Sequence, residues 1–283
     1  MRVAIMILLL STISIFSATQ SVIIEADGIA SMGDTKSRKE TISEAKKNAK
    51  RNAAENAGTY IKSETVVKNY MTEKDLMEAY SQAIVKVIEV ISGEWVKDDL
   101  MGDSYKIKVK VEVIPKLDKI KEMVNSSTII DDPTAPLTVK TWSDKKSKSY
   151  KKGEKIKVYL KGNKPFYARV VYKQLDGTLI QILPNPYRKD NYFNGGTMYE
   201  LPSGKDQYEL EVAAPYGKEN VIVYASTQEL GDVSLSDAES LYIVNESQKN
   251  TGIKTRGIKI KKKSKNSKVA EFFETEIEIN TEE

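Results

Sequence analysis

The chain has 283 residues, which gives room for about two domains. Its 44 Lys and Arg residues nearly balance 40 Asp and Glu residues, and a net charge of +4 is too small to indicate nucleic-acid binding. The chain contains no histidine and no cysteine, which excludes histidine general bases, thiol nucleophiles, disulfides and thiolate metal sites. Any catalysis would depend on carboxylate, Lys, Tyr, Ser or Thr side chains, or on a carboxylate-bound hard metal.

Residues 1–18 have the layout of a secretory signal peptide. Arg2 precedes an apolar run from Val3 to Phe16, and Ser17 and Ala18 supply small residues for cleavage. The run is shorter than the ~20 apolar residues that span a bilayer. We therefore expect an exported protein, periplasmic or extracellular and associated with the envelope; the alternative is an uncleaved anchor.

Residues 19–125 predict a small α+β domain. The segment Ser21–Ala30 alternates as a strand, and Asp34–Gly58 is typical of a helix that begins at Asp34 or Thr35 and ends at Gly58. An almost all-alanine stripe suits close packing on a sheet, and its residues are Ile42, Ala45, Ala49, Ala53 and Ala57. The basic residues Lys46, Lys47, Lys50 and Arg51 fall largely on the other face, as a solvated surface or as a patch for an anionic partner.

The remaining elements of this domain follow in order. A short helix is expected over 72–83, strands over 84–96 and 105–113, and a terminal helix over 115–124. In the second strand Tyr105, Ile107, Val109, Val111 and Val113 share one face. The other face carries Lys106, Lys108, Lys110 and Glu112, so the strand is half-buried with one wet face.

A family resemblance follows from GIASMGDTKSRKETISEAKKNAKRNAAENAGTYIKSET together with VIEVISGEW and YKIKVKVEV. These segments resemble the N-terminal domain of flagellar assembly protein T and related envelope lipoprotein domains, over roughly 90 residues. The resemblance implies an interaction module in an exported bacterial protein. It supplies no catalytic residues, and we infer no flagellar role from it.

Residues 126–136 form a polar, proline-bearing linker, and residues 137–245 change character. Short apolar or alternating runs recur about every ten residues, separated by turn formers, which predicts an antiparallel β-sandwich. The clearest hairpin signal is Leu175-Asp176-Gly177, because Asp-Gly suits tight turns. A helical segment is expected only at Ser234–Glu246.

This second region resembles the bacterial domain-of-unknown-function family 4384, over roughly 100 residues. The resemblance is carried by Tyr150, Gly153, the hairpin from Phe166-Tyr167 to Gly177, Leu183-Pro184-Asn185 and Ile222-Val223-Tyr224, with Thr255-Arg256-Gly257 further on. It implies an exported or envelope-associated β domain and no catalytic residues.

Residues 246–283 predict a lysine-rich tail with a final strand. The stretch Glu246–Gly252 looks flexible, and six lysines follow between Lys259 and Lys268, as a solvated loop or as a contact for anionic lipid or phosphate groups. Beyond them Phe273, Thr275, Ile277 and Ile279 alternate with glutamates, which predicts a strand that returns to the sandwich.

No pattern in the chain indicates a metal, a cofactor or a catalytic centre. The adjacent pairs Asp98-Asp99 and Asp131-Asp132 lie in a turn and in the linker, where neighbouring side chains point apart. Phosphate loops, nucleophile elbows and Ser-x-x-Lys motifs are absent.

The irregular stretch Leu183–Gly204 holds the candidate binding residues Tyr187, Arg188, Tyr192 and Phe193. Aromatic rings beside cations suit recognition of carbohydrate or protein, and they equally suit a long loop packed down by its own rings.

These observations favour a non-enzymatic binding or assembly protein of the bacterial cell envelope, with no cofactor. The expected partner is an envelope protein, a glycan or an anionic lipid surface, and not nucleic acid. The alternatives are an envelope hydrolase that uses carboxylates on a glycan or peptide, and a structural subunit of an envelope or flagella-associated assembly.

Overall fold

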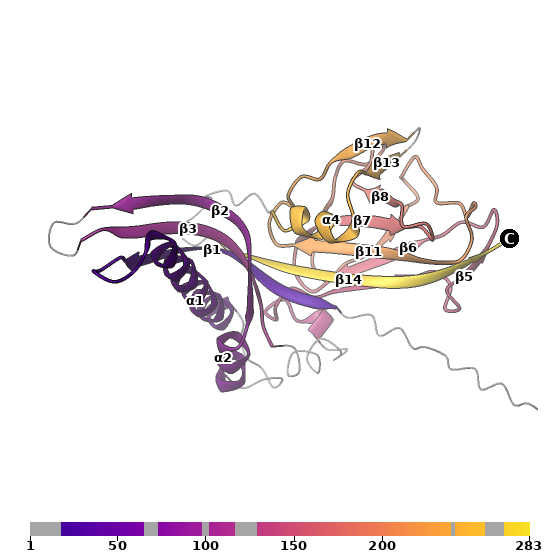
Figure 1. Cartoon of the computed structure of the whole chain (residues 1–283). Helices are drawn as coiled ribbons and strands as arrows, with labels where there is room; N and C mark the ends of the chain where they lie inside the picture. Colours follow the sequence, from indigo (N-terminus) through magenta and orange to yellow (C-terminus); the bar gives the residue numbers. More distant parts are fainter. Residues whose placement is uncertain (1–17, 65–72, 98–101, 117–128, 239–240, 258–268) are drawn as a thin grey trace, which may run out of the picture.

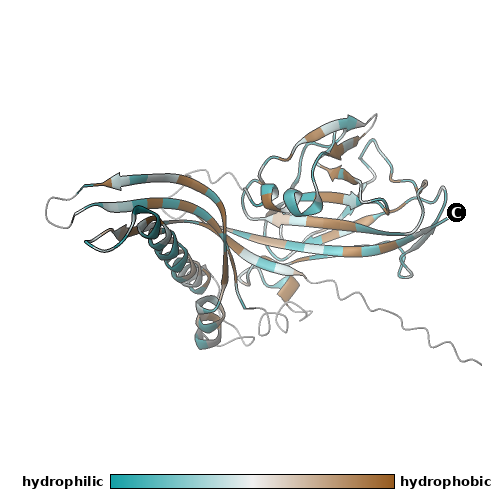
Figure 2. Ribbon diagram, in the orientation of Figure 1, coloured by the Kyte–Doolittle hydropathy of each residue, from teal (hydrophilic) through white to brown (hydrophobic). Residues whose placement is uncertain are grey.

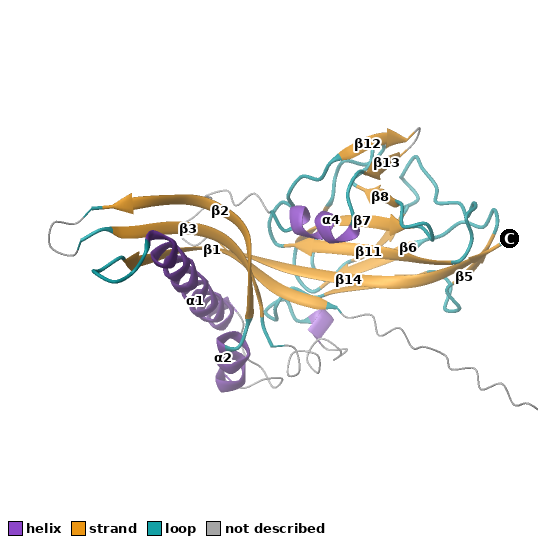
Figure 3. Ribbon diagram, viewed as in Figure 1, coloured by secondary structure: helices purple, strands orange, loops and turns teal. Residues whose placement is uncertain are grey.

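The computed structural model describes residues 18–64, 73–97, 102–116, 129–238, 241–257 and 269–283 (Figure 1). Nearly all of the expected targeting segment, the terminal helix over 115–124, Asp98-Asp99 and the lysine run lie outside these residues. Within them no helix is long and apolar enough to cross a membrane. The fold is α+β: a small α+β unit is followed by a β-sandwich (Figure 3).

The first unit is a three-stranded antiparallel sheet with a long helix on one face. Its elements are β1 (Thr19–Ser31), α1 (Arg38–Glu64), α2 (Glu73–Ser81), β2 (Ile84–Val96) and β3 (Ser104–Ile114). The strand order is β1-β3-β2, so β3 is central and β2 lies at an edge. The expected order of elements is therefore present in the first unit.

Helix α1 packs closely on β1 because small residues face each other. Ala45, Ala49, Ala53 and Ala57 are fully buried against the sheet, as the stripe predicts. A Cβ added to Gly28 of β1 would lie 2.2 Å from the carbonyl oxygen of Ala45, so only glycine fits at this crossing. The close packing fixes the position of the helix over the sheet.

Both predicted ends of α1 were wrong, and one residue predicted to belong to its buried stripe is exposed. Ser37, not Asp34 or Thr35, opens the helix: its hydroxyl accepts from the Glu40 amide, while the Glu40 carboxylate accepts from the Ser37 amide. Gly58 does not end the helix, since its Cα lies against Tyr80 of α2 and the chain stays helical to Glu64. Ile42 is exposed rather than part of the buried stripe.

The second unit is a two-layer sandwich. A small sheet has the order β10-β6-β4, and strands β7, β8, β11 and β14 of the large sheet pack against it. Its elements are β4 (Val139–Ser143), β5 (Ser149–Lys151), β6 (Val158–Gly162), β7 (Phe166–Lys173), β8 (Leu179–Leu183), β9 (Tyr192–Phe193), β10 (Met198–Leu201), β11 (Lys218–Ser226), β12 (Leu235–Ala238), β13 (Leu241–Val244), α4 (Gln248–Thr255) and β14 (Val269–Glu282). The predicted Asp-Gly turn joins β7 to β8, with Gly177 at φ 87° and the Asp176 carboxylate accepting from the Thr178 amide.

Two expectations for the end of this unit were wrong. Ser234–Glu246 is not a helix, because Leu235 pairs with Val244 and Ala238 with Leu241 in a β-hairpin. The stretch expected to be flexible begins helix α4, whose N-cap Ser247 accepts from the Asn250 amide.

Strand β14 joins the two units into one sheet. Its first half pairs with β1 (Thr19 with Glu274), and most of its length pairs with β11 (Lys218 with Asn280). The large sheet therefore runs β12-β13-β8-β7-β11-β14-β1-β3-β2 without a break among the described residues, and in Figure 1 β14 and β1 together extend from one end of the molecule to the other. Brown apolar and teal polar residues alternate along these strands (Figure 2).

A buried ion cluster lies where the two units meet. Arg256, just after α4, donates from Nε to Glu112 of β3 at 2.6 Å and pairs with Glu274 of β14. Glu112 also accepts from the Ser21 hydroxyl of β1 at 2.8 Å. One guanidinium thus binds groups from both units.

The segment expected to be a linker is attached to the sandwich. In its described part, from residue 129 on, Ile129 and Ala135 are buried, and a short 3₁₀ turn spans Ile129–Asp131. The Asn163 side chain accepts from the Thr138 amide and donates to the carbonyl oxygens of Asp132 and Ala135. One side chain of the sandwich therefore satisfies several backbone groups of this segment and holds it in place.

Candidate functional site: an apolar cavity with a buried glutamate

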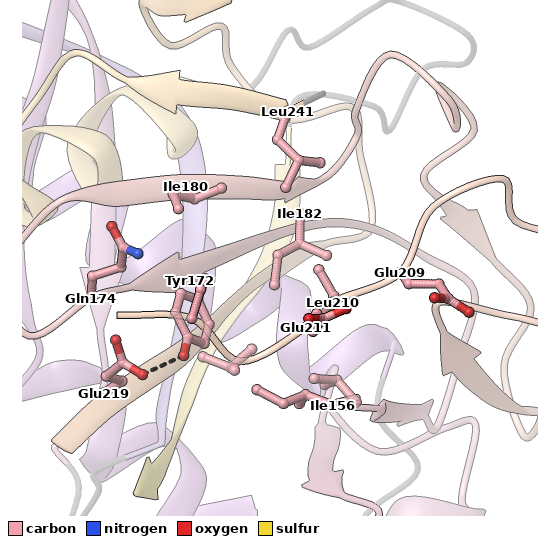
Figure 4. A pocket seen from close by; sticks show the side chains of 13 residues that line it. Ile156, Tyr172, Gln174, Ile180, Ile182, Glu209, Leu210, Glu211, Glu219 and Leu241 are labelled. Carbon is pink, nitrogen blue, oxygen red and sulfur yellow. Dashed lines mark hydrogen bonds between the residues drawn. The ribbon is translucent and has the colours of Figure 1, made fainter. Parts of the chain in front are cut away.

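A cavity of about 160 Å³ opens between the inner face of the large sheet and the segment 209–213 (Figure 4). Most of its walls are apolar, contributed by Ile156, Val158, Ile180, Ile182, Leu210, Ala213, Val221 and Leu241. The polar groups in the lining are Tyr172, Gln174 and three glutamates. An apolar pocket with a few polar groups is the usual form of a ligand site.

Glu219 is the most unusual residue of the cavity. It lies two residues before Val221 on β11, so alternation turns its side chain into the sandwich with Val221 and Val223. It is only 2% exposed. A carboxylate is rarely buried to this degree without partners.

Two hydroxyl groups hold this carboxylate in place. Tyr172 of β7 donates to Glu219 Oε2 at 2.5 Å, and Thr281 of β14 donates to the same oxygen at 2.9 Å. Burial raises the pKa of the Tyr172 phenol, and the hydrogen bond to Glu219 raises it further, so the phenol stays a donor. Glu219 Oε1 has no partner among the described residues and remains able to accept a hydrogen bond.

Gln174 adds a second polar group at the same end of the cavity. Lys173 pairs with Asn220, so the next position along each strand brings Gln174 beside Glu219 (Figure 4). Its side-chain amide makes no hydrogen bond to another described residue. The site therefore offers a carboxylate oxygen and an amide above apolar walls, an arrangement suited to an apolar group with a hydrogen-donating or cationic head.

The other two glutamates belong to the rim. Glu209 and Glu211 are exposed, and Glu209 pairs with Lys155 at 2.7 Å. Figure 4 shows Glu209 away from the end that holds Glu219. The described residues contain no group of three or more acidic side chains able to hold a metal ion.

The four residues expected to bind a ligand lie outside this cavity. Phe193 is fully buried, with its ring 5.2 Å from that of Phe166. Arg188 lies over the Phe193 ring at 5.5 Å and pairs with Asp206 at 3.0 Å. The structure thus brings Arg188 and Phe193 together as packing residues.

Tyr187 and Tyr192 remain on the surface, 47% and 44% exposed. Tyr187 stacks on Tyr208, with 6.3 Å between the ring centroids, and Tyr192 meets Tyr167 edge to face at 5.1 Å. No described contact tests their role in recognition, which stays a prediction.

The irregular loop nevertheless supports the cavity. Its contacts to Asp206 and Tyr208 hold the segment that continues directly into the wall formed by residues 209–213. Asn185 shapes the start of the loop, because its side chain accepts from the amides of Tyr187 and Arg188. Disturbing the loop would therefore move one wall of the cavity.

The other charged residues considered from the sequence either contact neighbouring residues of the chain or lie exposed on its surface. Asp131 pairs with Lys161, and Asp132 accepts from the Thr134 amide and hydroxyl, so the adjacent acids point to different partners. On α1 the side chains of Lys46 and Lys47 are exposed, which fits a solvated face and leaves an anionic partner as a prediction.

Sequence reasoning missed Glu219. The available signal was its position within KENVIVYAS, where an acid falls in phase with Val221, Val223 and Ala225. An acidic residue on the inward face of a buried strand needs a partner, and that requirement marks it for attention.

Comparison with known families supports the resemblance of the second unit. Residues 149–229 match the model of a family described as a domain of unknown function, DUF4384. The match includes Tyr172, Gln174 and Glu219. No curated protein and no solved structure matches the chain, and none of the comparisons supports the resemblance of the first unit to flagellar assembly protein T.

Proposed function

We propose that this is a non-enzymatic binding protein of the bacterial cell envelope, exported to the periplasm or the extracellular space, whose sandwich receives one side chain of a partner protein. The observation that supports this most is the free Oε1 of Glu219 inside an apolar cavity. Oε1 faces the cavity, and a cationic or hydrogen-donating group that enters can bond to it in apolar surroundings, where a charge-assisted hydrogen bond is strong.

Size and charge favour a protein among the three expected partner classes. A cavity of about 160 Å³ is below the ~300–1,000 Å³ of sites for drug-sized ligands, so it suits a single side chain better than a glycan. The acidic lining repels anionic lipid head groups. A lysine side chain has the matching form, an apolar stem with a cationic head.

A thermal-shift series with n-pentylamine, n-pentanol and n-pentanoate tests the chemistry of the cavity. Ligands that bind the folded state raise its melting temperature. We expect a saturable increase with the amine and none with the carboxylate. Glu219→Gln should abolish the increase, whereas Glu209→Gln, at the exposed rim, should retain it. An equal response to pentanoate, or no saturable response to the amine, would contradict the proposal.

Retention of envelope proteins then tests the partner class. Immobilised wild-type protein and the Glu209→Gln variant should retain the same protein from envelope extracts, and Glu219→Gln should lose it.

A carboxylate hydrolase is the second candidate, because Glu209 and Glu211 also line the cavity. If the protein is a hydrolase, the wild type should release products from envelope glycan or peptide, and the Glu219→Gln variant should release none. Binding of the amine without any product release would favour the binding protein.

A further inference from the structure

Strand β2 is a long edge strand that runs from the middle of the molecule to the end away from the sandwich (Figure 1). It spans Ile84–Val96 and, among the described residues, pairs with β3 alone. Four of its apolar side chains are unusually exposed for their size: Ile84 at 62%, Val90 at 50%, and Ile91 and Val96 at 40% each. An open edge with apolar side chains is a template for another strand.

The side chains of β2 repeat symmetrically about Val90. Two register shifts, at Ile88 and Ile91, leave two regular segments, 84–87 and 92–96, with Glu89 and Val90 between the shifts. Five positions pair with the α1-facing residues of β3 and so share that face of the sheet: Val85, Val87, Val90, Gly93 and Trp95. If two copies of β2 are aligned antiparallel with Val90 opposite Val90, Val85 lies opposite Trp95 and Val87 lies opposite Gly93. Each residue of this face then lies opposite a residue of the same face in the other copy.

The opposite face is also complementary. In the same alignment Lys86 of each copy lies opposite Glu94 of the other copy, so the pair of strands contains two matched cation–anion contacts. Ile84 lies opposite Val96, which places two exposed apolar side chains together. Cross-strand pairs of these kinds stabilise antiparallel sheets.

We propose that β2 pairs antiparallel with β2 of a second copy of this chain, about a two-fold axis through Val90. The axis is perpendicular to the sheet, so the sheet continues from one copy into the other and both copies of α1 lie on the same face. The exposed apolar side chain of Val90 is then covered by its symmetry mate. Such self-complementary contacts are the form that two-fold dimers take.

The bulges limit which partner fits. They interrupt the flat edge near Ile88 and Ile91, and such irregularities discourage pairing with an arbitrary strand. With Val90 opposite Val90, residues 84–87 of each copy face the regular residues 93–96 of the other. The irregular centres face each other, with Ile88 opposite Ser92 and Glu89 opposite Ile91. A second copy therefore matches the outer segments in both spacing and charge.

Engineered cysteines test the register directly, because the chain has no cysteine of its own. Opposed Cα atoms in an antiparallel pair are about 4.5–5.5 Å apart, within the range that a disulfide bridges. Val90→Cys should therefore give a disulfide-linked dimer under mild oxidation. Lys86→Cys should not, because its symmetry mate lies eight residues along the strand, ~27 Å away, whereas Lys86→Cys/Glu94→Cys should cross-link.

Charge exchange tests the same pairing without oxidation. Sedimentation equilibrium should show a concentration-dependent dimer for the wild type. Lys86→Glu and Glu94→Lys should each be monomeric at concentrations where the wild type is dimeric, and an equimolar mixture of the two should associate again. Circular dichroism establishes that each variant is folded.

A wild type that stays monomeric at every concentration would overturn the proposal. So would a dimer that Val90→Cys does not cross-link, or that survives both charge changes, since either result would place the contact elsewhere.

Discussion

Among single residues outside the cavity, Arg256 connects the two units. Its guanidinium contacts Glu112 and Glu274 and lies over the Phe272 ring at 4.7 Å. Glu112 is almost fully buried, and Ser21 is its other partner. Removing the cation would leave a buried carboxylate without charge compensation.

Arg256→Met should lower the free energy of unfolding by about 3–5 kcal/mol, measured by urea denaturation, because breaking a buried pair on one side costs this much. The matched control is Arg51→Met on α1, an exposed residue 3.9 Å from Glu55, where the change should stay below about 1 kcal/mol. Equal effects of the two substitutions would show that Arg256 is not an anchor.

Sequence reasoning identified some of these residues without their roles. Arg256 was noted only as part of Thr255-Arg256-Gly257, because its partners come from strands far away in the chain. Tyr187, Arg188, Tyr192 and Phe193 were noticed for their composition. Composition does not show that Phe193 packs on Phe166 while Tyr187 stays at the surface.

At the scale of elements, the contact between α1 and β1 depends on one glycine. The Cα of Gly28 lies against the backbone of α1 at Ala45 and Ala49, so an added side chain meets atoms that cannot rotate away. The helix would have to move off the sheet, which would open the packing of its alanine stripe.

Gly28→Val should lower the free energy of unfolding by about 1–3 kcal/mol, the usual cost of overpacking, or more if the helix cannot shift. Gly204→Val is the control: no atom lies within 4 Å of its Cβ position, and we expect a change within about 0.5 kcal/mol. Thermal melts followed by circular dichroism measure both. A stable Gly28→Val variant would mean that the helix is not held at this crossing.

Periodicity predicted the elements better than their ends. The alanine stripe and the alternating residues of β3 repeat at the period of a helix and of a strand, so the sequence shows which side of each element is buried. Both buried faces are present in the structure. The boundaries of α1 depend instead on Ser37 and Glu40 and on the packing of Gly58 against α2. The hairpin at 235–244 was mistaken for a helix because its pairing with β8 is a long-range contact.

For the whole molecule, the continuous sheet predicts one cooperative unfolding transition. Unfolding either unit alone would leave one side of β14 unpaired, which makes partial unfolding unfavourable. The division into domains at 19–125 and 137–245 therefore has a direct test in solution.

The two tryptophans report on different units, since Trp95 lies in β2 and Trp142 in β4. Trp142→Phe leaves only Trp95, which reports on the first unit, and Trp95→Phe leaves only Trp142, which reports on the sandwich. The fluorescence of each variant should give the same urea midpoint as its circular dichroism. Ala270→Pro removes a backbone donor where β14 pairs with Ile23 but not with β11, and it should separate the two midpoints. Separate midpoints in chains without this proline would mean that the units fold independently.

The same strand also affects how the chain reaches its structure. Thr19 pairs with Glu274, so one edge of β1 stays open until nearly the whole chain up to β14 has been synthesised. Pairings between such distant segments form slowly, and an open edge that carries Ile23 invites association with other chains in the meantime. The first unit can assemble its helix early, but its folding rate depends on a segment that is translated long after it.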